Sequence, residues 1–109
     1  MSDLSQKHCV PCEGGALPLM RDESAKLLEQ TPGWTISPDG LSLHRRFTFK
    51  NFVDAMNFAN TITPIAESEG HHPDLAIAWG KVDVPLMTHA IGGLSENDFI
   101  LAAKINAIG

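Results

Sequence analysis

The sequence has no excess of basic residues, no long apolar run and no recognisable export signal. Its 13 acidic residues outnumber its 8 Lys and Arg residues, which gives a formal net charge of -5. This balance provides no electrostatic attraction for nucleic-acid phosphates or for anionic membranes. No apolar run approaches the roughly 18 residues that span a bilayer, and no signal-peptide pattern opens the chain. We therefore expect no nucleic-acid partner, no membrane partner and a cytoplasmic location.

Cysteine is scarce as well, and both cysteines lie in one short motif near the start. Cys9 and Cys12 form a Cys-x-x-Cys pair directly after His8. A closed zinc site needs four ligands, and a thioredoxin-type motif follows a strand, which is not indicated here. We interpret residues 1–17 as a flexible N-terminal lead-in that carries two reduced thiols. Metal capture and redox use stay open as alternatives.

The remaining composition is that of an ordinary globular domain. Hydrophobic residues make up 43% of the 109 residues and charged residues 19%, a balance that argues against extensive disorder. A chain of this length has room for one compact core. We expect a single domain over residues 18–109.

The first part of this domain has the pattern of a helix followed by a hairpin. Charged and apolar residues at 21–30 have a helical spacing, which Thr31-Pro32-Gly33 ends. Alternating residues at 34–37 and 41–49 flank Pro38-Asp39-Gly40, a typical turn sequence. These two runs predict a pair of antiparallel strands.

Residues 51–69 have the period of a long helix. Asn51 is a candidate N-cap, and Pro64 removes a backbone hydrogen bond, so we expect a kink near residues 60–64. One apolar stripe runs along the expected helix: Phe52, Ala55, Met56, Ala59, Ile62 and Ala66.

The last part of the domain repeats the order of hairpin and helix. Apolar residues alternate on both sides of Gly80-Lys81, and Pro85 should face a sheet edge or a bulge because it has no N–H. Ser95 to Asp98 reads as a capping box, and Leu94 and Phe99 have the spacing of a hydrophobic staple. The sequence therefore predicts an α+β fold in the order helix, hairpin, helix, hairpin, helix. We expect a four-stranded antiparallel sheet with the helices packed on one face, and the uncovered face and edges favour self-association.

Three histidines occupy the two far ends of the second hairpin. His71 and His72 precede its first strand, and His89 ends its second strand. Because the far ends of a hairpin lie together, the three imidazoles can line one pocket and transfer protons near neutral pH. Two alternatives stay open at this point. The histidines can be ordinary surface or capping residues, or Glu67 and His71 at helical spacing can hold a metal with His89.

These residues, with their spacing, resemble the signature of the pterin-4a-carbinolamine dehydratase family. The core of the signature is Glu67-x3-His71-His72-Pro73 followed by Trp79, His89 and Asp98. Supporting matches are Pro32-Gly33-Trp34, Phe47-x-Phe49-x-x-Phe52 and Gly93-Leu94-Ser95-x-x-Asp98. The resemblance covers residues 21–109 and leaves out the segment with the two cysteines.

The resemblance implies a dehydration reaction without a cofactor. In this reaction a 4a-hydroxytetrahydropterin loses water to give quinonoid dihydropterin, which recycles the cofactor of aromatic amino-acid hydroxylases. It implies His71, His72 and His89 as catalytic residues, with Gly70 and Thr88 joining them in contact with the pterin. It also implies a small-molecule pterin as the partner, no metal or other cofactor, and a homodimer or homotetramer. The alternative is a non-catalytic dimerisation module, since animal members also act as coactivators.

Four further residues are expected to support the site structurally, behind the residues that contact the substrate. They are Glu67, Asp74, Trp79 and Asp98. Asp98 is interpreted mainly as the capping residue of the last helix, with catalysis as the alternative. Trp79 is interpreted mainly as a core residue, because it shares its parity with Leu75 and Ile77, with pterin stacking as the alternative.

Overall fold

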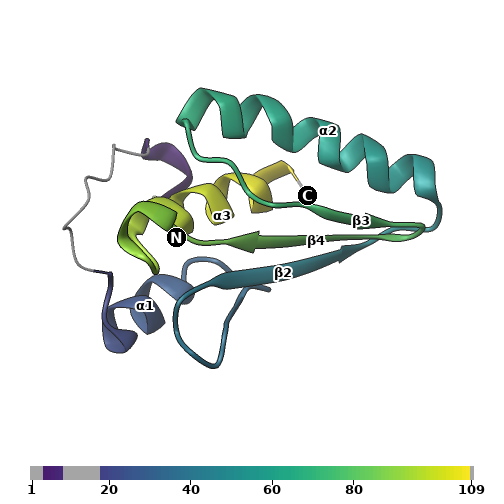
Figure 1. The fold of residues 1–109 in the computed structure, drawn as a ribbon. Helices are drawn as coiled ribbons and strands as arrows, with labels where there is room; N and C mark the ends of the chain where they lie inside the picture. Colours follow the sequence, from purple (N-terminus) through teal and green to yellow (C-terminus); the bar gives the residue numbers. More distant parts are fainter. Residues whose placement is uncertain (1–3, 9–17, 109) are drawn as a thin grey trace.

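The computed structural model describes residues 4–8 and 18–108, so the predictions for Cys9 and Cys12 lie outside the described residues. The elements, in order, are the 3-10 helix η1 (Leu4–Gln6), α1 (Arg21–Leu28), β1 (Thr35–Ile36), β2 (Leu43–Thr48), α2 (Phe52–Glu69), β3 (Ala76–Ala78), β4 (Lys81–Leu86), the 3-10 helix η2 (His89–Ile91) and α3 (Glu96–Ile108). Apart from the two short 3-10 helices, this is the predicted order of helices and hairpins (Figure 1).

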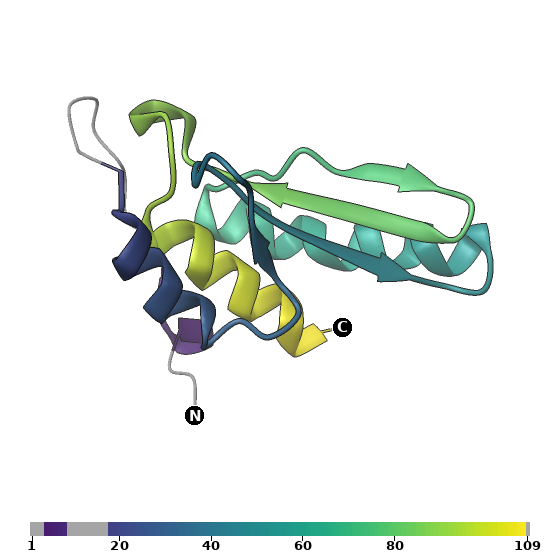
Figure 2. The same ribbon diagram turned by 90° about the horizontal axis from the view of Figure 1, so that it is seen from below.

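The four strands form one antiparallel sheet in the order β1-β2-β4-β3. Its centre is the pairing of β2 with β4, from Leu43 opposite Leu86 to Thr48 opposite Lys81. Helices α2 and α3 lie against one face, and the other face is open (Figures 1 and 2). The predicted α+β arrangement is confirmed.

Alternation along the central strands separates a core face from a solvent face. The side chains toward the helices are buried, among them Leu43, Phe47, Val82, Val84 and Leu86. On the open face, Arg46 and His44 both bond Asp83, at 2.8 and 3.0 Å. The hydrogen bond from Arg46 holds the pKa of Asp83 below its usual range. His44 therefore belongs to a surface ion-pair cluster on the open face of the sheet.

Helix α2 begins as predicted and continues through its proline. The Asn51 side chain accepts a hydrogen bond from the Asp54 N–H at 2.7 Å, which confirms the N-cap. Pro64 lies inside the helix without ending it. The predicted apolar stripe needs one correction: Phe52 is 49% exposed, whereas Phe58 is buried against the rings of Phe47 and Phe49.

The second hairpin confirms the interpretation of Pro85 and contradicts that of Trp79. Strand β3 pairs only with Lys81–Asp83 of β4, so Pro85 lies past the end of β3, where no neighbouring strand on that side needs its N–H. Trp79 is 69% exposed instead of buried in the core. It occupies the turn after β3, where the alternation of the strand has ended, so strand parity no longer decides its burial.

Helix α3 is the most enclosed element of the fold. Leu94 and Phe99, the two residues of the predicted staple, are fully buried, as is most of the helix. The Ser95 N–H donates to Asp98 Oδ2 at 3.0 Å, which confirms the capping interaction. The helix contacts α2, α1 and η1.

Residues 4–8, the described part of the N-terminal segment, pack on the domain, so the expectation of a flexible lead-in does not hold for these five residues. Leu4 is 2% exposed and packs in the main core cluster. Lys104 of α3 donates to the Ser5 carbonyl at 2.9 Å, and Lys7 pairs with Glu96 at 3.0 Å. None of the helices in the described residues is long and apolar enough to cross a membrane.

Candidate active site

The three predicted histidines lie at one end of the molecule. This end holds the last turn of α2, the 3-10 helix η2 and the start of α3 (Figure 1). The chain leaves α2 through Gly70, which has a φ of 63°. Gly70 donates to the Glu67 carbonyl and His71 donates to the Ala66 carbonyl, at 3.3 and 3.2 Å. This is a Schellman ending, for which glycine is preferred because it adopts a positive φ without strain.

Gly70 therefore has a structural role, and its predicted contact with the pterin stays a prediction. The left-handed turn ends the helix and sends the two following histidines in different directions. His71 bonds a residue of α3, and His72 bonds a residue of α2. The expected pairing of Glu67 with His71 at helical spacing is wrong, because the helical path stops before His71.

His71 forms a largely buried polar contact with Asp98. Its Nε2 lies 2.7 Å from Asp98 Oδ1; the His71 side chain is 15% exposed and the Asp98 side chain is fully buried. The other carboxylate oxygen, Oδ2, accepts hydrogen bonds from the Thr88 hydroxyl at 2.9 Å and the Ser95 N–H at 3.0 Å. Asp98 thus caps α3 as predicted and also binds a predicted catalytic histidine.

The contact with Asp98 bears on which nitrogen of a neutral His71 ring carries the proton. Opposite an ionised carboxylate, which only accepts hydrogen bonds, a neutral ring carries its proton on Nε2. Nδ1 then keeps its lone pair and acts as an acceptor. The arrangement of a carboxylate behind an imidazole is the one that orients a general base.

His72 bonds the Glu67 side chain on the outer surface of α2. Both side chains are largely exposed, at 62% and 69%. Beside this pair is a cavity of about 180 Å³ lined mainly by apolar groups, namely Ile62, Thr63, Ala66, Glu67, His72, Pro73 and Leu75. Of the three predicted histidines, only His72 lines this cavity.

His89 lies in a short helix instead of at the end of a strand. Strand β4 ends at Leu86, and His89 is the first residue of η2. Its side chain is 75% exposed, and its Nε2 lies 3.9 Å from the carboxylate of Asp74, which is also exposed. An exposed pair at this distance contributes little stability. The His89 ring therefore faces solvent.

Thr88 is held by protein groups at the site. We expected a contact with substrate, yet the residue is 6% exposed and its hydroxyl bonds Asp98 and Ser95. The hydroxyl is therefore bonded to protein groups and largely shielded from solvent. The neighbouring His89 is the residue of this pair that faces solvent. The sequence does not show which of these two residues is buried and which is exposed, because they are neighbours in one loop.

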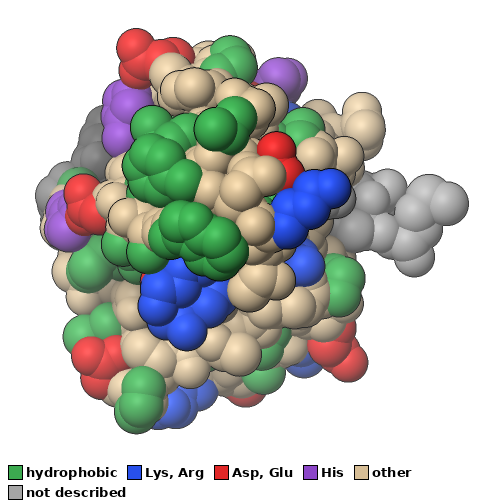
Figure 3. All heavy atoms as spheres, turned by 90° about the vertical axis from the view of Figure 1, so that its right-hand side faces the viewer, with side chains coloured by type: hydrophobic (Ala, Val, Ile, Leu, Met, Phe, Trp, Pro, Cys, Tyr) green, Lys and Arg blue, Asp and Glu red, His purple; other side chains and the backbone are tan. Residues whose placement is uncertain are grey.

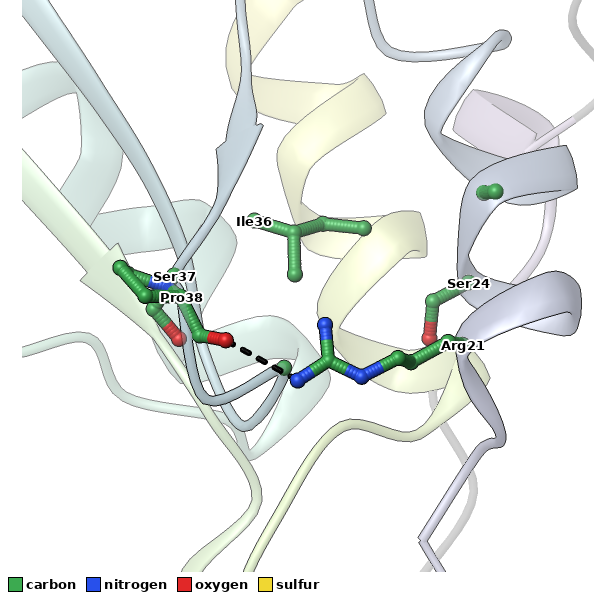
Figure 4. A pocket seen from close by; sticks show the side chains of 7 residues that line it. Arg21, Ser24, Ile36, Ser37 and Pro38 are labelled. Carbon is green, nitrogen blue, oxygen red and sulfur yellow. Dashed lines mark hydrogen bonds between the residues drawn. The ribbon is translucent and has the colours of Figure 1, made fainter.

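A second cavity lies between α1 and the β1–β2 turn and has no residue in common with the histidine site. Its volume is about 340 Å³. Arg21 crosses it and donates to the Pro38 carbonyl at 2.9 Å (Figure 4). The Ser24 hydroxyl, also drawn there, is buried and has no hydrogen-bond partner among the described residues. Within residues 4–8 and 18–108, no three His, Cys, Asp or Glu side chains lie close enough together to hold a metal ion.

The fold and the site together define a small α+β domain whose candidate active site is built from histidines and carboxylates at one end of the sheet. A family model described as pterin 4 alpha carbinolamine dehydratase matches residues 17–108. The chain belongs to this family, whose named activity is that of a lyase. The resemblance predicted from the sequence is thus confirmed.

Curated relatives carry the same family name. A protein of Halorhodospira halophila is 48% identical over 106 residues, which cover 97% of each chain. The Arabidopsis thaliana protein named pterin-4-alpha-carbinolamine dehydratase 2, mitochondrial, is 49% identical over 112 residues, which cover 99% of this chain and 60% of the relative.

Solved structures confirm the fold. The crystal structure of a transcriptional coactivator/pterin dehydratase from Brucella melitensis is 35% identical with a TM-score of 0.79, covering 84% of this chain and 97% of that one. A pterin dehydratase-like protein described as a RuBisCO assembly factor in the alpha-carboxysome is 20% identical with a TM-score of 0.60. At that identity the second likeness shows the fold alone.

Proposed function

We propose that this protein dehydrates 4a-hydroxytetrahydropterin to quinonoid dihydropterin and so returns the pterin cofactor of aromatic amino-acid hydroxylases to use. The observation that carries the proposal is the buried Asp98 carboxylate behind His71, next to the loop that presents His89. Membership of the dehydratase family supports the same reaction.

The reaction needs one proton removed and one proton supplied. The bond between C4a and its hydroxyl oxygen breaks, the oxygen takes up a proton and leaves as water, and N5 gives up its proton as the C4a–N5 double bond forms. No electron is gained or lost overall. A base at N5 and an acid at the hydroxyl are sufficient, and each such group typically contributes about 10²- to 10⁴-fold in rate.

The hydrogen bonds suggest how the two roles are divided. His71 keeps its proton on Nε2 toward Asp98, so its Nδ1 is the base for the N5 proton. His89 is the acid for the leaving hydroxyl, because its exposed ring can take a new proton from solvent after each turnover. His72 lines the apolar cavity, and its role is to bind the pterin and not to transfer a proton.

The His89→Ala variant tests this assignment. We expect kcat to fall by about 10²-fold or more, because the departing hydroxyl loses its proton donor. The exposed position should leave the free energy of unfolding within about 0.5 kcal/mol of the unchanged protein. The measurement is turnover of 4a-hydroxytetrahydropterin against the nonenzymatic rate. Near-normal kcat with weaker pterin binding would instead make His89 a binding residue.

The same assay separates catalysis from the second candidate function. The name of the Brucella melitensis structure includes a transcriptional coactivator, which supports a non-catalytic dimerisation module on this fold. A module of that kind would leave the nonenzymatic dehydration rate unchanged at any protein concentration. Acceleration by the unchanged chain and its loss in His89→Ala would support the enzyme.

We also propose that the chain forms a homodimer or homotetramer. Apolar side chains gather over the β3–β4 turn and the start of α2, beside Lys and Arg (Figure 3). The exposed apolar residues of these two segments include Phe52, Val53 and Trp79, at 49%, 65% and 69%. A contiguous apolar surface of this kind is typical of a protein interface.

Sedimentation velocity at micromolar concentration tests this proposal. We expect a mass of at least twice 11.8 kDa, and we expect Trp79→Ser to shift the distribution toward the monomer. Lys26→Ser on the exposed surface of α1 is the control and should sediment like the unchanged chain. A monomer of the unchanged chain would contradict the proposal.

A further inference from the structure

Thr88 lies between strand β4 and the loop that carries His89, and its main chain closes that loop. Its N–H donates to the Gly93 carbonyl at 2.8 Å, and the Gly93 N–H returns to the Thr88 carbonyl at 3.4 Å. The same carbonyl also accepts from the Ile91 N–H at 3.2 Å. The backbone of Thr88 therefore determines where η2, and with it His89, begins.

The Thr88 side chain bonds the start of α3, which also bonds His71. Its hydroxyl lies 2.9 Å from Asp98 Oδ2 and 2.8 Å from the Ser95 hydroxyl. Because a carboxylate only accepts, Thr88 donates to Asp98 and uses its lone pair to accept from Ser95. The hydroxyl chain thus runs from Ser95 through Thr88 to Asp98, whose other oxygen holds the Nε2 proton of His71.

We propose that Thr88 is a positioning residue that couples the two proton-transferring histidines. Its backbone places His89, and its hydroxyl orients the carboxylate that determines the tautomer of His71. The expected change in kcat rests on the proposed function. The expected orientation of Asp98 does not depend on that function. Thr88 itself is 6% exposed and touches no reacting atom in this assignment.

Loss of the hydroxyl has a defined physical consequence. Asp98 Oδ2 would keep the Ser95 N–H as a donor and lose the only side-chain donor that the described contacts give it. A buried acceptor that loses a partner is destabilised, and the side chain that carries it is free to seek another rotamer. Oδ1 would then no longer face His71 in one fixed orientation, and the Nε2–H tautomer would lose its preference.

The experiment compares Thr88→Val, which keeps the shape and removes the hydroxyl, with Thr88→Ser, which keeps the hydroxyl. We expect Thr88→Val to lower kcat by about 10- to 100-fold, the range seen when a group that orients a functional ligand is removed, with KM changed less than about threefold. Thr88→Ser should keep kcat within about threefold. Thr48→Val, at an exposed position on the open sheet face, is the matched control and should behave like the unchanged chain.

A second readout needs no turnover. The ¹⁵N spectrum of the His71 imidazole should show one tautomer, with the proton on Nε2, in the unchanged chain and in Thr88→Ser. We expect Thr88→Val to show a mixture of tautomers. Thr88→Ala removes the hydroxyl with a smaller side chain, so the comparison does not depend on the folding of one variant.

The outcomes separate this proposal from the proposed function. An unchanged His71 spectrum in folded Thr88→Val or Thr88→Ala overturns the positioning role. Equal losses of kcat in Thr88→Ser and Thr88→Val also overturn it, because packing and not the hydroxyl would then be responsible. The expected spectra in a protein that does not accelerate dehydration would support the positioning role and refute the proposed function.

Discussion

Replacing Asp98 by Asn is expected to lower kcat by about 10²- to 10⁴-fold, the range of a lost general base, while KM changes little. The reason lies in the donors around the carboxylate. The Ser95 N–H is a main-chain donor that cannot turn around, and with the Thr88 hydroxyl it occupies Oδ2. The single oxygen of the introduced amide must therefore take that position, which leaves the amide NH₂ facing His71.

An NH₂ group at this place reverses the polarity of the contact with His71. Nε2 can then only accept, so the ring proton of the neutral imidazole moves to Nδ1. The base proposed for N5 is lost, although every side chain keeps its volume. Both KM and the overall fold should therefore change far less than kcat.

Asp74→Asn is the matched control for this experiment. Asp74 is the other aspartate near a predicted histidine, but its side chain is 90% exposed and lies 3.9 Å from His89. We expect its removal to change kcat by less than about threefold, in line with the small contribution of exposed pairs. If Asp98→Asn kept near-normal kcat, or Asp74→Asn lost as much, the assignment of His71 as the oriented base would be wrong.

The sequence predicted the elements of the fold because their signals are local. Capping residues, turn sequences and hydrophobic periods each act over a few neighbouring residues, and they located three helices and two hairpins. Asn51 and the Ser95 to Asp98 box were confirmed at the level of hydrogen bonds. These interactions form within one turn of chain, so tertiary structure does not override them.

The chemistry of the site depends on contacts between segments, and there the sequence was less informative. Asp98 was interpreted mainly as a helix cap, and it caps α3 and also bonds His71. Thr88 and His89 are neighbours, yet one is buried and the other exposed. Strand parity placed Trp79 in the core, but β3 ends at Ala78 and Trp79 lies in the turn that follows, where parity no longer applies.

In the N-terminal segment, the sequence pattern also failed to indicate that a single apolar residue is buried. Leu4 is surrounded by polar residues, so no period indicates that it is buried. The structure places it in the core cluster against α3, where it is 2% exposed. Lys104 of α3 joins the segment to the end of α2, because it donates to the Ser5 carbonyl and lies 3.7 Å from Glu69.

Leu4→Ala is therefore expected to lower the free energy of unfolding by about 2–5 kcal/mol, as for other buried leucines. The cost has two parts, the lost burial of three carbon atoms and the cavity that remains beneath η1. A loss of this size is a large fraction of the total stability of a domain of this length. Equilibrium denaturation in urea, monitored by fluorescence of Trp34 in the core, measures the loss.

Leu41→Ala is the control, because Leu41 is 40% exposed and its truncation should cost well under half as much. A flexible lead-in would give the opposite result, with Leu4→Ala unfolding within about 0.5 kcal/mol of the unchanged chain. Because η1 packs on the helix that carries Asp98, Leu4→Ala should also lower activity as temperature rises, at a point where Leu41→Ala is still active. Loss of stability without this earlier loss of activity would mean that the segment stabilises the domain but does not support the site.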